Sequence, residues 1–290
     1  MGALRPSWAA HSVCTFSVSA AEAPTLIAVD VYVDLVRYRE LFGSLFRRDF
    51  RARYKGSVLG VAWSLANPLI LMGVYLLLFS VLWQVVKSID HYPLYLLSGL
   101  AVWVFFATSL QQASRSMVDY SELIRKVKFP RQLVAFSTVA TQLVAFCAML
   151  VVLFVIDLIV LPRVRGVMWV AIPLAALIVC FVGGLALAIA SANVIFRDVE
   201  HLVSAALLPW FFLTPVLWTF DQFAAHPTLQ EILRWGNPVT PPIEAIRAPL
   251  YAGTLPHWTD VLYTVGVTAA ALAFGAWVFG RVDDRIAVEL

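Results

Sequence analysis

The stretch from Leu133 to Leu161 reads LVAFSTVATQLVAFCAMLVVLFVIDLIVL and contains a single charged residue, Asp157. A helix needs about 20 mostly apolar residues to cross the hydrocarbon core of a bilayer, and this stretch is longer than that. Five further stretches qualify in the same way: Val58–Val86, Pro93–Leu110, Val167–Ala192, Leu202–Phe220 and Val261–Phe279. The sequence therefore predicts an all-α membrane protein with six transmembrane helices.

The overall composition separates this chain from soluble proteins. Hydrophobic residues make up 61% of its 290 residues and charged residues 13%, and the mean hydropathy is +0.83. Soluble domains contain about 45–50% apolar and about 25% charged residues. The three cysteines, Cys14, Cys147 and Cys180, lack short spacing, which indicates neither a disulfide framework nor a zinc site.

The distribution of Lys and Arg predicts the orientation, because cytoplasmic segments carry the excess of these residues. With a cytoplasmic N-terminus, fifteen of them fall inside and five outside. The inside set is Arg37, Arg39, Arg47, Arg48, Arg51, Arg53, Lys55, Arg115, Arg125, Lys126, Lys128, Arg131, Arg197, Arg281 and Arg285; the outside set is Lys87, Arg163, Arg165, Arg234 and Arg247. We therefore expect both termini in the cytoplasm.

The first 24 residues mix Ser, Ala and Pro without a sustained apolar core, so they are a poor signal peptide. We assign residues 1–30 to a loose N-terminal tail, residues 31–57 to an amphipathic cytoplasmic interface helix, and residues 58–290 to a six-helix permease domain.

The interface helix is predicted from apolar residues that recur at close to helical period: Leu35, Tyr38, Phe42, Leu45, Phe46, Phe50 and Tyr54. Arg37, Arg47, Arg48 and Arg51 fall on the other side. A basic amphipathic helix of this kind lies flat in the membrane interface, with its arginines against anionic headgroups. The alternative is a soluble helix that docks on another domain.

Residues 114–130 form a second charged segment outside the spans. Met117, Tyr120, Ile124 and Val127 make one apolar stripe, and Pro130 prevents the helix from continuing. From the pattern alone, this short cytoplasmic helix is either a solvated loop helix or a docking element for a cytosolic partner. Residues 221–260 contain six prolines among apolar patches, which favours a broken, re-entrant segment over a span.

Several kinds of catalytic or energy-coupling chemistry have no counterpart in the sequence. The chain contains no Gly-Lys pair and hence no P-loop, and its five His residues are scattered without metal spacing. An ion-coupled carrier needs ionisable groups near the bilayer midplane, but Asp157 lies near the end of its span. There it could reach the interface or pair with Arg163 or Arg165. Energy coupling is therefore expected from a separate subunit.

The spans are rich in aromatic residues and contain one small-residue face. Gly183, Gly184, Ala186, Ala188 and Ala190 suit close helix packing. Single aromatic residues are expected in interface belts or lipid-facing packing. As a set, however, aromatic faces could stack on sugar rings and line a conduit for a glycan. The candidates are Trp63, Tyr75, Trp103, Phe106, Phe211, Phe212 and Trp218.

The sequence RDFRARYKGSVLG at residues 48–60, with WSLANP at residues 63–68, resembles the start of the first span in polysaccharide-exporting ABC permeases. These are the membrane subunits for O-antigen, capsule and teichoic acid export. Further matching motifs are YPLYLLSGL at 92–100, LIRKVKFP at 123–130, NVIFRDV at 193–199, NP at 237–238 and AIR at 245–247. The resemblance extends from about Leu35 to Leu290 and leaves the N-terminal 24 residues unmatched.

The resemblance implies an exporter in the cytoplasmic (inner) membrane, built from two copies of this permease and two cytosolic ABC ATPase subunits. ATP and Mg belong to the ATPase subunits, so no cofactor and no enzymatic activity are expected in this chain, and nucleic acid is not an expected partner. The implied cargo is a polyprenyl-pyrophosphate-linked cell-envelope polysaccharide.

The resemblance also implies roles for particular residues. ATPase coupling would involve the charged residues of the 114–130 helix, Asp119, Glu122, Arg125, Lys126 and Lys128. Contact with lipid or pyrophosphate at the cytoplasmic mouth would involve Arg47, Arg48, Arg51, Arg53 and Lys55, since arginine–phosphate bonds are charge-assisted. Two short re-entrant helices within residues 221–260 would shape the extracytoplasmic exit.

Three alternative functions stay open at this point. One is an ABC exporter of a small lipid or drug, which an apolar channel without an aromatic ladder would favour. Another is a membrane-embedded glycosyltransferase, for which Asp283 and Asp284 offer the one tempting carboxylate pair. Their neighbours Arg281 and Arg285 indicate a charge-balanced tail instead. A self-sufficient secondary carrier is disfavoured by the lack of midplane charge.

Overall fold

The computed structural model describes residues 31–57, 60, 62–78, 89–127, 129–223 and 225–289, and the regular secondary structure in these ranges is helical. The predicted tail, residues 1–30, lies outside the described residues. The all-helical architecture predicted from the apolar runs is therefore confirmed for the described chain.

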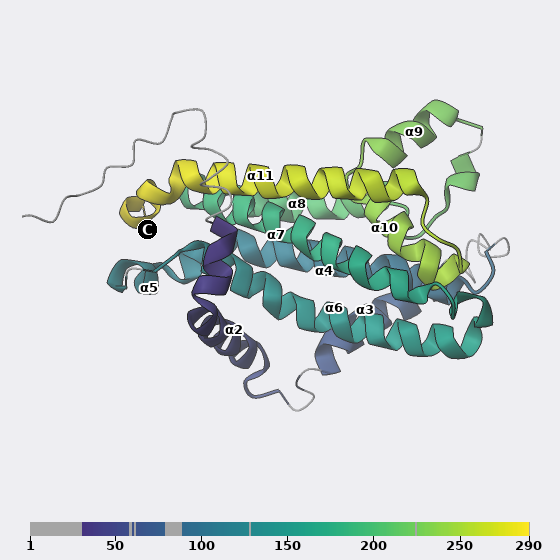
Figure 1. The fold of residues 1–290 in the computed structure, drawn as a ribbon, viewed down its shortest axis with the longest axis horizontal. Coiled ribbons are helices and arrows are strands. Elements are labelled where there is room, and N and C mark those ends of the chain that lie inside the picture. Colours follow the sequence, from purple (N-terminus) through teal and green to yellow (C-terminus); the bar gives the residue numbers. More distant parts are fainter. Residues whose placement is uncertain are drawn as a thin grey trace, which may run out of the picture.

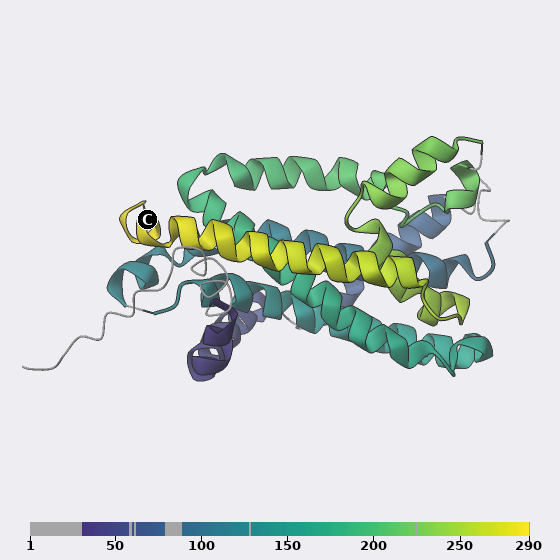
Figure 2. The same ribbon diagram turned by 45° about the horizontal axis from the view of Figure 1, so that its top comes forward.

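Four long helices run side by side and form the body of the protein (Figures 1 and 2). They are α4 (Tyr92–Asp119), α6 (Gln132–Val160), α7 (Ala171–Ile195) and α11 (Trp258–Glu289). Each contains a segment long and apolar enough to cross a membrane. These helices correspond to the second, third, fourth and sixth predicted spans.

Two shorter apolar helices correspond to the first and fifth predicted spans. They are α3 (Ala62–Leu77) and α8 (Asp198–Leu213), each of 16 residues. At about 1.5 Å per residue α8 is about 24 Å long, less than the hydrocarbon core of about 30 Å. Helix α8 ends where Thr214 adopts an extended conformation (φ −99°, ψ 136°) before Pro215, because a residue preceding proline is disfavoured in the helical region. Residues 79–88 of the first predicted span lie outside the described residues.

Helices α7 and α11 pack closely against each other in the protein body. A Cβ atom added to Gly184 would lie 2.6 Å from the α11 backbone at Ala271, and one added to Gly275 would meet the carbonyl oxygen of Gly184. The two glycines therefore let the helix backbones touch, which confirms the close packing predicted for this small-residue face.

The connecting helices gather at the two ends of the body (Figure 1). One end carries α2 (Arg39–Tyr54), α5 (Ser121–Lys126) and the C-terminal end of α11; we call it the α5 end. The opposite end carries α9 (Pro227–Trp235) and α10 (Thr240–Arg247); we call it the α9 end. The remaining short elements are η3 (Pro162–Val164), η4 (Met168–Val170), η5 (Phe220–Phe223) and η6 (Ala248–Ala252).

Two of the predicted connecting helices are divided by a turn. Residues 31–37 are helical and a turn at Tyr38 separates them from α2. The segment predicted as one helix over residues 114–130 belongs to two: α4 continues to Asp119, Tyr120 forms a turn, and α5 follows as a six-residue helix. Asp119 and the α5 residues therefore lie on different helices.

Candidate functional site

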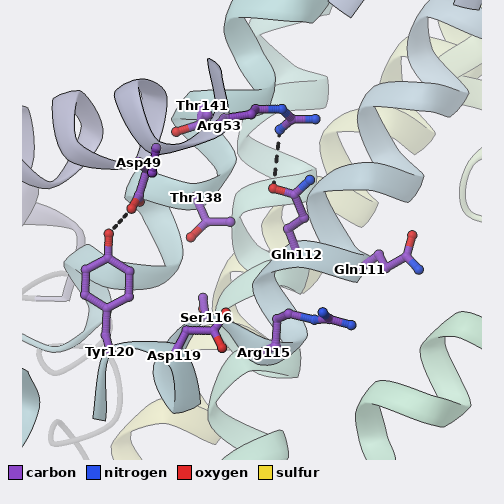
Figure 3. Close-up of a pocket in the computed structure, with 11 residues that line it drawn as sticks. Asp49, Arg53, Gln111, Gln112, Arg115, Ser116, Asp119, Tyr120, Thr138 and Thr141 are labelled. Atoms are coloured by element: carbon purple, nitrogen blue, oxygen red, sulfur yellow. Dashed lines mark hydrogen bonds between the residues drawn. The ribbon is translucent and has the colours of Figure 1, made fainter. Parts of the chain in front are cut away.

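A polar cavity of about 480 Å³ lies at the α5 end, between α2, α4 and α6 (Figure 3). Four charged residues line it: Asp49 and Arg53 from α2, and Arg115 and Asp119 from α4. Ala52 and the amide and hydroxyl side chains of six further residues complete the lining: Gln111, Gln112, Ser116, Tyr120, Thr138 and Thr141. We call this space the α2–α4 cavity.

Asp49 fixes α2 over this cavity by accepting two hydrogen bonds from other elements. The Tyr120 hydroxyl donates to Oδ1 of Asp49, and Ser137 of α6 donates to Oδ2 over 3.1 Å. The Arg48 guanidinium lies 4.0 Å from the centre of the Tyr120 ring. Burial and the bond to Asp49 raise the pKa of Tyr120, so its hydroxyl stays protonated and donates. We call Asp49, Tyr120 and Ser137 the Asp49 junction.

The other polar side chains of the cavity differ in the number of hydrogen bonds and ion pairs that they form with the protein. Arg115 forms an ion pair with Glu200 of α8. Arg53 donates one hydrogen bond of 3.3 Å to Gln112. The side chains of Asp119 and Gln111 make no hydrogen bond or ion pair with any residue that the structure describes. These two side chains are therefore available to a ligand.

The five basic residues predicted at the membrane mouth do not form one group. Arg47, Arg51 and Lys55 are exposed and spaced by four, which places them on one stripe along α2 and its C-cap. Arg48 packs over Tyr120, and Arg53 lines the α2–α4 cavity.

Most of the residues predicted to couple to an ATPase lie on α5 and project from the α5 end. Glu122 and Lys126 form an exposed ion pair over 3.4 Å, and Arg125 is also exposed. Ile124 is buried at 6% exposure among Met117, Leu133 and Leu45 of α2. This apolar anchor holds α5 to the body while its charged face stays free. Asp119 lines the α2–α4 cavity instead, and Lys128 lies outside the described residues.

An aromatic cavity of about 300 Å³ lies between α3, α4 and α8. Tyr75, Trp103 and Phe211 line it. The Phe211 ring centre is 5.6 Å from that of Tyr75 and 5.5 Å from that of Trp103. Gln111 lines both this cavity and the α2–α4 cavity, so the two spaces adjoin along α4.

The other predicted aromatic residues are distributed around this group. Phe106 is 1% exposed and packs inside against Trp103, with ring centres 5.5 Å apart. Phe212 contacts Phe211 at 5.3 Å and is half exposed. Trp63 lines a separate cavity beside Arg53. Trp218 lies beyond the end of α8, with its ring centre 5.4 Å from that of Phe220.

The lining of the α2–α4 cavity contains residues that the sequence motifs do not identify. Gln111, Arg115 and Asp119 of this lining follow one another at intervals of four residues, and Thr108 of the adjoining aromatic cavity precedes them by three, so all four share a face of α4. This polar periodicity at the end of an apolar span is the signal that would have predicted them.

A buried arginine organises the α9 end. The Arg247 side chain is 4% exposed, and its guanidinium lies 3.8 Å from the centre of the Tyr95 ring. It donates to the Tyr95 hydroxyl over 3.0 Å and to the carbonyl of Pro215 over 2.9 Å, and it pairs with Glu244. Arg247 thereby holds α10 against α4 and against the chain that leaves α8.

Asp157, the charged residue within the apolar runs, is buried at 1% exposure in α6. Neither carboxylate oxygen has a hydrogen-bond partner among the described residues. Arg165 donates to the carbonyl of Leu158 and Arg163 to the carbonyl of Tyr251. The suggested pairing of Asp157 with one of these arginines is therefore absent from the described chain.

Comparison with known proteins places these features in a family context. A family model described as ABC-2 type transporter matches residues 40–251. The O-antigen export system permease protein RfbA of Myxococcus xanthus is 32% identical over 260 residues, covering 89% of this chain and 98% of that protein. Two proteins of the same description from Klebsiella pneumoniae are 30% and 29% identical over 254 residues, covering 86% of this chain and 94% of each relative.

Proposed function

The chain belongs to the ABC-2 type transporter family, and from this premise we propose that it is the membrane permease of an O-antigen-type export system. Its cargo is a polyprenyl-pyrophosphate-linked cell-envelope polysaccharide, which it moves across the cytoplasmic membrane. The observation that carries the proposal is the similarity to O-antigen export permeases over 89% of the chain. The family model, over residues 40–251, includes the residues that line both cavities.

The energy source is ATP hydrolysis in a separate ABC subunit, since the sequence contains no P-loop. Two permeases and two ATPase subunits make up the complex. The ATPase contacts the exposed face of α5, with Glu122, Arg125 and Lys126 as the contact residues. Burial of Ile124 supports this role, because a rigidly anchored helix transmits a push to the body.

We assign six membrane spans to the permease, with α3 and α8 completing the set of four long helices. The α5 end faces the cytoplasm and the α9 end faces outward, in agreement with the predicted excess of Lys and Arg on the inside. Helices α9 and α10 then form the re-entrant region of the exit.

The exposed basic stripe of α2 and the aromatic cavity supply the route for the cargo. The exposed stripe of Arg47, Arg51 and Lys55 meets anionic headgroups and the pyrophosphate at the cytoplasmic mouth. Beyond it, Tyr75, Trp103 and Phe211 offer ring faces to the sugars. Aromatic stacking tolerates different sugars, which suits a conduit for a polymer.

Co-purification from native membranes tests the proposal. A tag on this subunit should recover a P-loop ATPase in equal ratio, and the purified complex should hydrolyse ATP. The lipid-linked glycan extracted from the same cells should change that turnover. Stimulation by small lipids or drugs alone would favour the alternative cargo, and recovery of the permease without an ATPase would refute the proposal.

The α5 contact is tested separately with a charge reversal. Glu122→Arg should weaken recovery of the ATPase and reduce export, because it repels a basic partner group and breaks the pair with Lys126. Glu231→Arg on α9, at the opposite end, is the matched control and should leave recovery unchanged. Intact docking and export in Glu122→Arg would show that the coupling assignment is wrong.

A further inference from the structure

We propose that the α2–α4 cavity binds a neutral sugar ring of the exported glycan, close to the pyrophosphate that joins the glycan to its lipid. The inference rests on the proposed function and makes it more specific. It assigns recognition of the sugar to this chain at its α5 end, separately from the exposed basic stripe and from the aromatic cavity.

The charge balance of the cavity is the first argument. Asp49 and Asp119 face the same space as Arg53 and Arg115, so two carboxylates offset two guanidinium groups (Figure 3). A pyrophosphate in this space would meet two negative charges, and like charges in close contact disfavour binding. A sugar has no such conflict, because its hydroxyl groups donate to carboxylates and accept from guanidinium and amide groups.

The second argument is the hydrogen-bonding capacity that the protein leaves unused. The side chains of Asp119 and Gln111 make no hydrogen bond with a described residue, and Arg53 donates one hydrogen bond of the five that a guanidinium group offers. Thr138 and Thr141 donate to the carbonyls of Val134 and Ser137 over 3.1 Å and 3.0 Å, so their hydroxyl oxygens can still accept.

The third argument is the position and size of the cavity. Its volume of about 480 Å³ lies within the range of small-molecule sites, about 300–1,000 Å³. The stripe of Arg47, Arg51 and Lys55 runs along the same helix that supplies Asp49 and Arg53, on a different face. Gln111 adjoins the aromatic cavity. The basic stripe, the α2–α4 cavity and the aromatic cavity therefore match three successive parts of the ligand: its pyrophosphate, its first sugar and its further sugars.

The test uses the purified permease–ATPase complex in lipid nanodiscs and two probes. One probe is the lipid-linked glycan extracted from the source cells, and the other is sugar-free polyprenyl pyrophosphate. ATP turnover is measured against the concentration of each probe. Asp119→Ala should raise the half-maximal concentration of the glycan-bearing lipid about tenfold or more, the effect of losing a hydrogen bond to a charged group. The half-maximal concentration of the sugar-free lipid should change less than about twofold, because that probe lacks the sugar that Asp119 contacts.

Two further variants keep the outcome interpretable. Gln111→Ala should show the same selective effect and serves if Asp119→Ala does not assemble. Arg51→Ala should raise the half-maximal concentrations of both probes, because Arg51 contacts the pyrophosphate that the two probes share. The sugar site would be overturned if Asp119→Ala and Gln111→Ala raised the half-maximal concentrations of both probes equally. It would also be overturned if they changed neither concentration. If neither probe changes turnover of the wild-type complex, the proposed function itself fails.

Discussion

Arg247 illustrates how a buried charge is made tolerable at the residue scale. Its guanidinium is 4% exposed and is matched by the Tyr95 ring, the Tyr95 hydroxyl, the Pro215 carbonyl and Glu244. Space for it on α4 comes from Gly99, where an added Cβ atom would lie 2.5 Å from Nη2 of Arg247. A planar, multidentate cation is required for this set of contacts, and a lysine cannot replace it.

We therefore predict that Arg247→Lys destabilises the protein by about 2–4 kcal/mol, because a single ammonium group cannot satisfy the buried acceptors together. Thermal unfolding of the detergent-solubilised protein measures the change. Arg125→Lys, on the exposed face of α5, is the control and should unfold at the wild-type temperature. Equal unfolding temperatures for both variants would contradict the role given to Arg247.

The Asp49 junction makes a second residue-scale prediction. Tyr120→Phe keeps the ring beneath Arg48 and removes the hydroxyl that donates to Asp49. Loss of this bond should weaken the attachment of α2 by about 1–3 kcal/mol. Limited trypsin digestion should then cut faster at the arginines of α2, since local opening exposes them.

The matched control for that experiment is Tyr38→Phe. Tyr38 lies in the turn before α2, is 41% exposed and makes no side-chain hydrogen bond with a described residue. The Tyr38→Phe protein should be cleaved by trypsin at the same rate as the wild type. A Tyr120→Phe protein that resists trypsin equally well would show that Asp49 does not depend on this donor.

At the scale of elements, the contact between α7 and α11 depends on two glycines. We predict that Gly275→Ala destabilises the protein by about 1–3 kcal/mol, because the added methyl group meets the backbone of Gly184, which cannot move aside. Gly266→Ala on the same helix has no atom within 4 Å of the added group. It should be neutral or stabilising by up to about 1 kcal/mol through helix propensity. Thermal unfolding of the two variants side by side checks the difference.

The sequence predicts the long helices well and their ends poorly, for a physical reason. Apolar residues mark the membrane-crossing part of α4 and stop near Leu110, but the helix continues to Asp119, and Ala113, Ser116 and Met117 in its last turns are buried. The break at Tyr120 has no proline or glycine to signal it. At this turn Tyr120 contacts Asp49 and Arg48, which are distant in the sequence.

The sequence predicts which types of residue form the candidate site, but it does not predict which of them lie together. The sequence indicates Arg47, Arg48, Arg51 and Arg53 of α2 as candidates, but which of them faces the cavity depends on how α2 rests on α6. A continuous helix over residues 114–130 would group Asp119 with the α5 charges, whereas the structure places it on α4. Among the aromatic residues, the sequence cannot separate the buried Phe106 from Phe211, which lines a cavity, since both lie in uniformly apolar runs.

At the scale of the whole molecule, the two ends should lie on opposite sides of the membrane. In a protein with Cys14, Cys147 and Cys180 replaced by serine, we predict that Glu231→Cys reacts with a membrane-impermeant maleimide in intact spheroplasts. Glu122→Cys should react only after the membrane is permeabilised. Both positions are exposed, so access alone decides the result. Labelling of Glu122→Cys in intact spheroplasts would reverse the proposed orientation.

The lengths of the helices also matter for the lipid around the protein. With α8 spanning the membrane as proposed, its 16 residues fall about 6 Å short of the usual hydrocarbon thickness, whereas α6 has 29 residues and exceeds it. Such hydrophobic mismatch is relieved by local thinning of the bilayer, at fractions of a kcal/mol for each Å. Longer acyl chains raise this elastic cost and shorter chains remove it. The fatty-acid composition of the membrane therefore acts on this exporter through α8, the helix whose Phe211 lines the aromatic cavity.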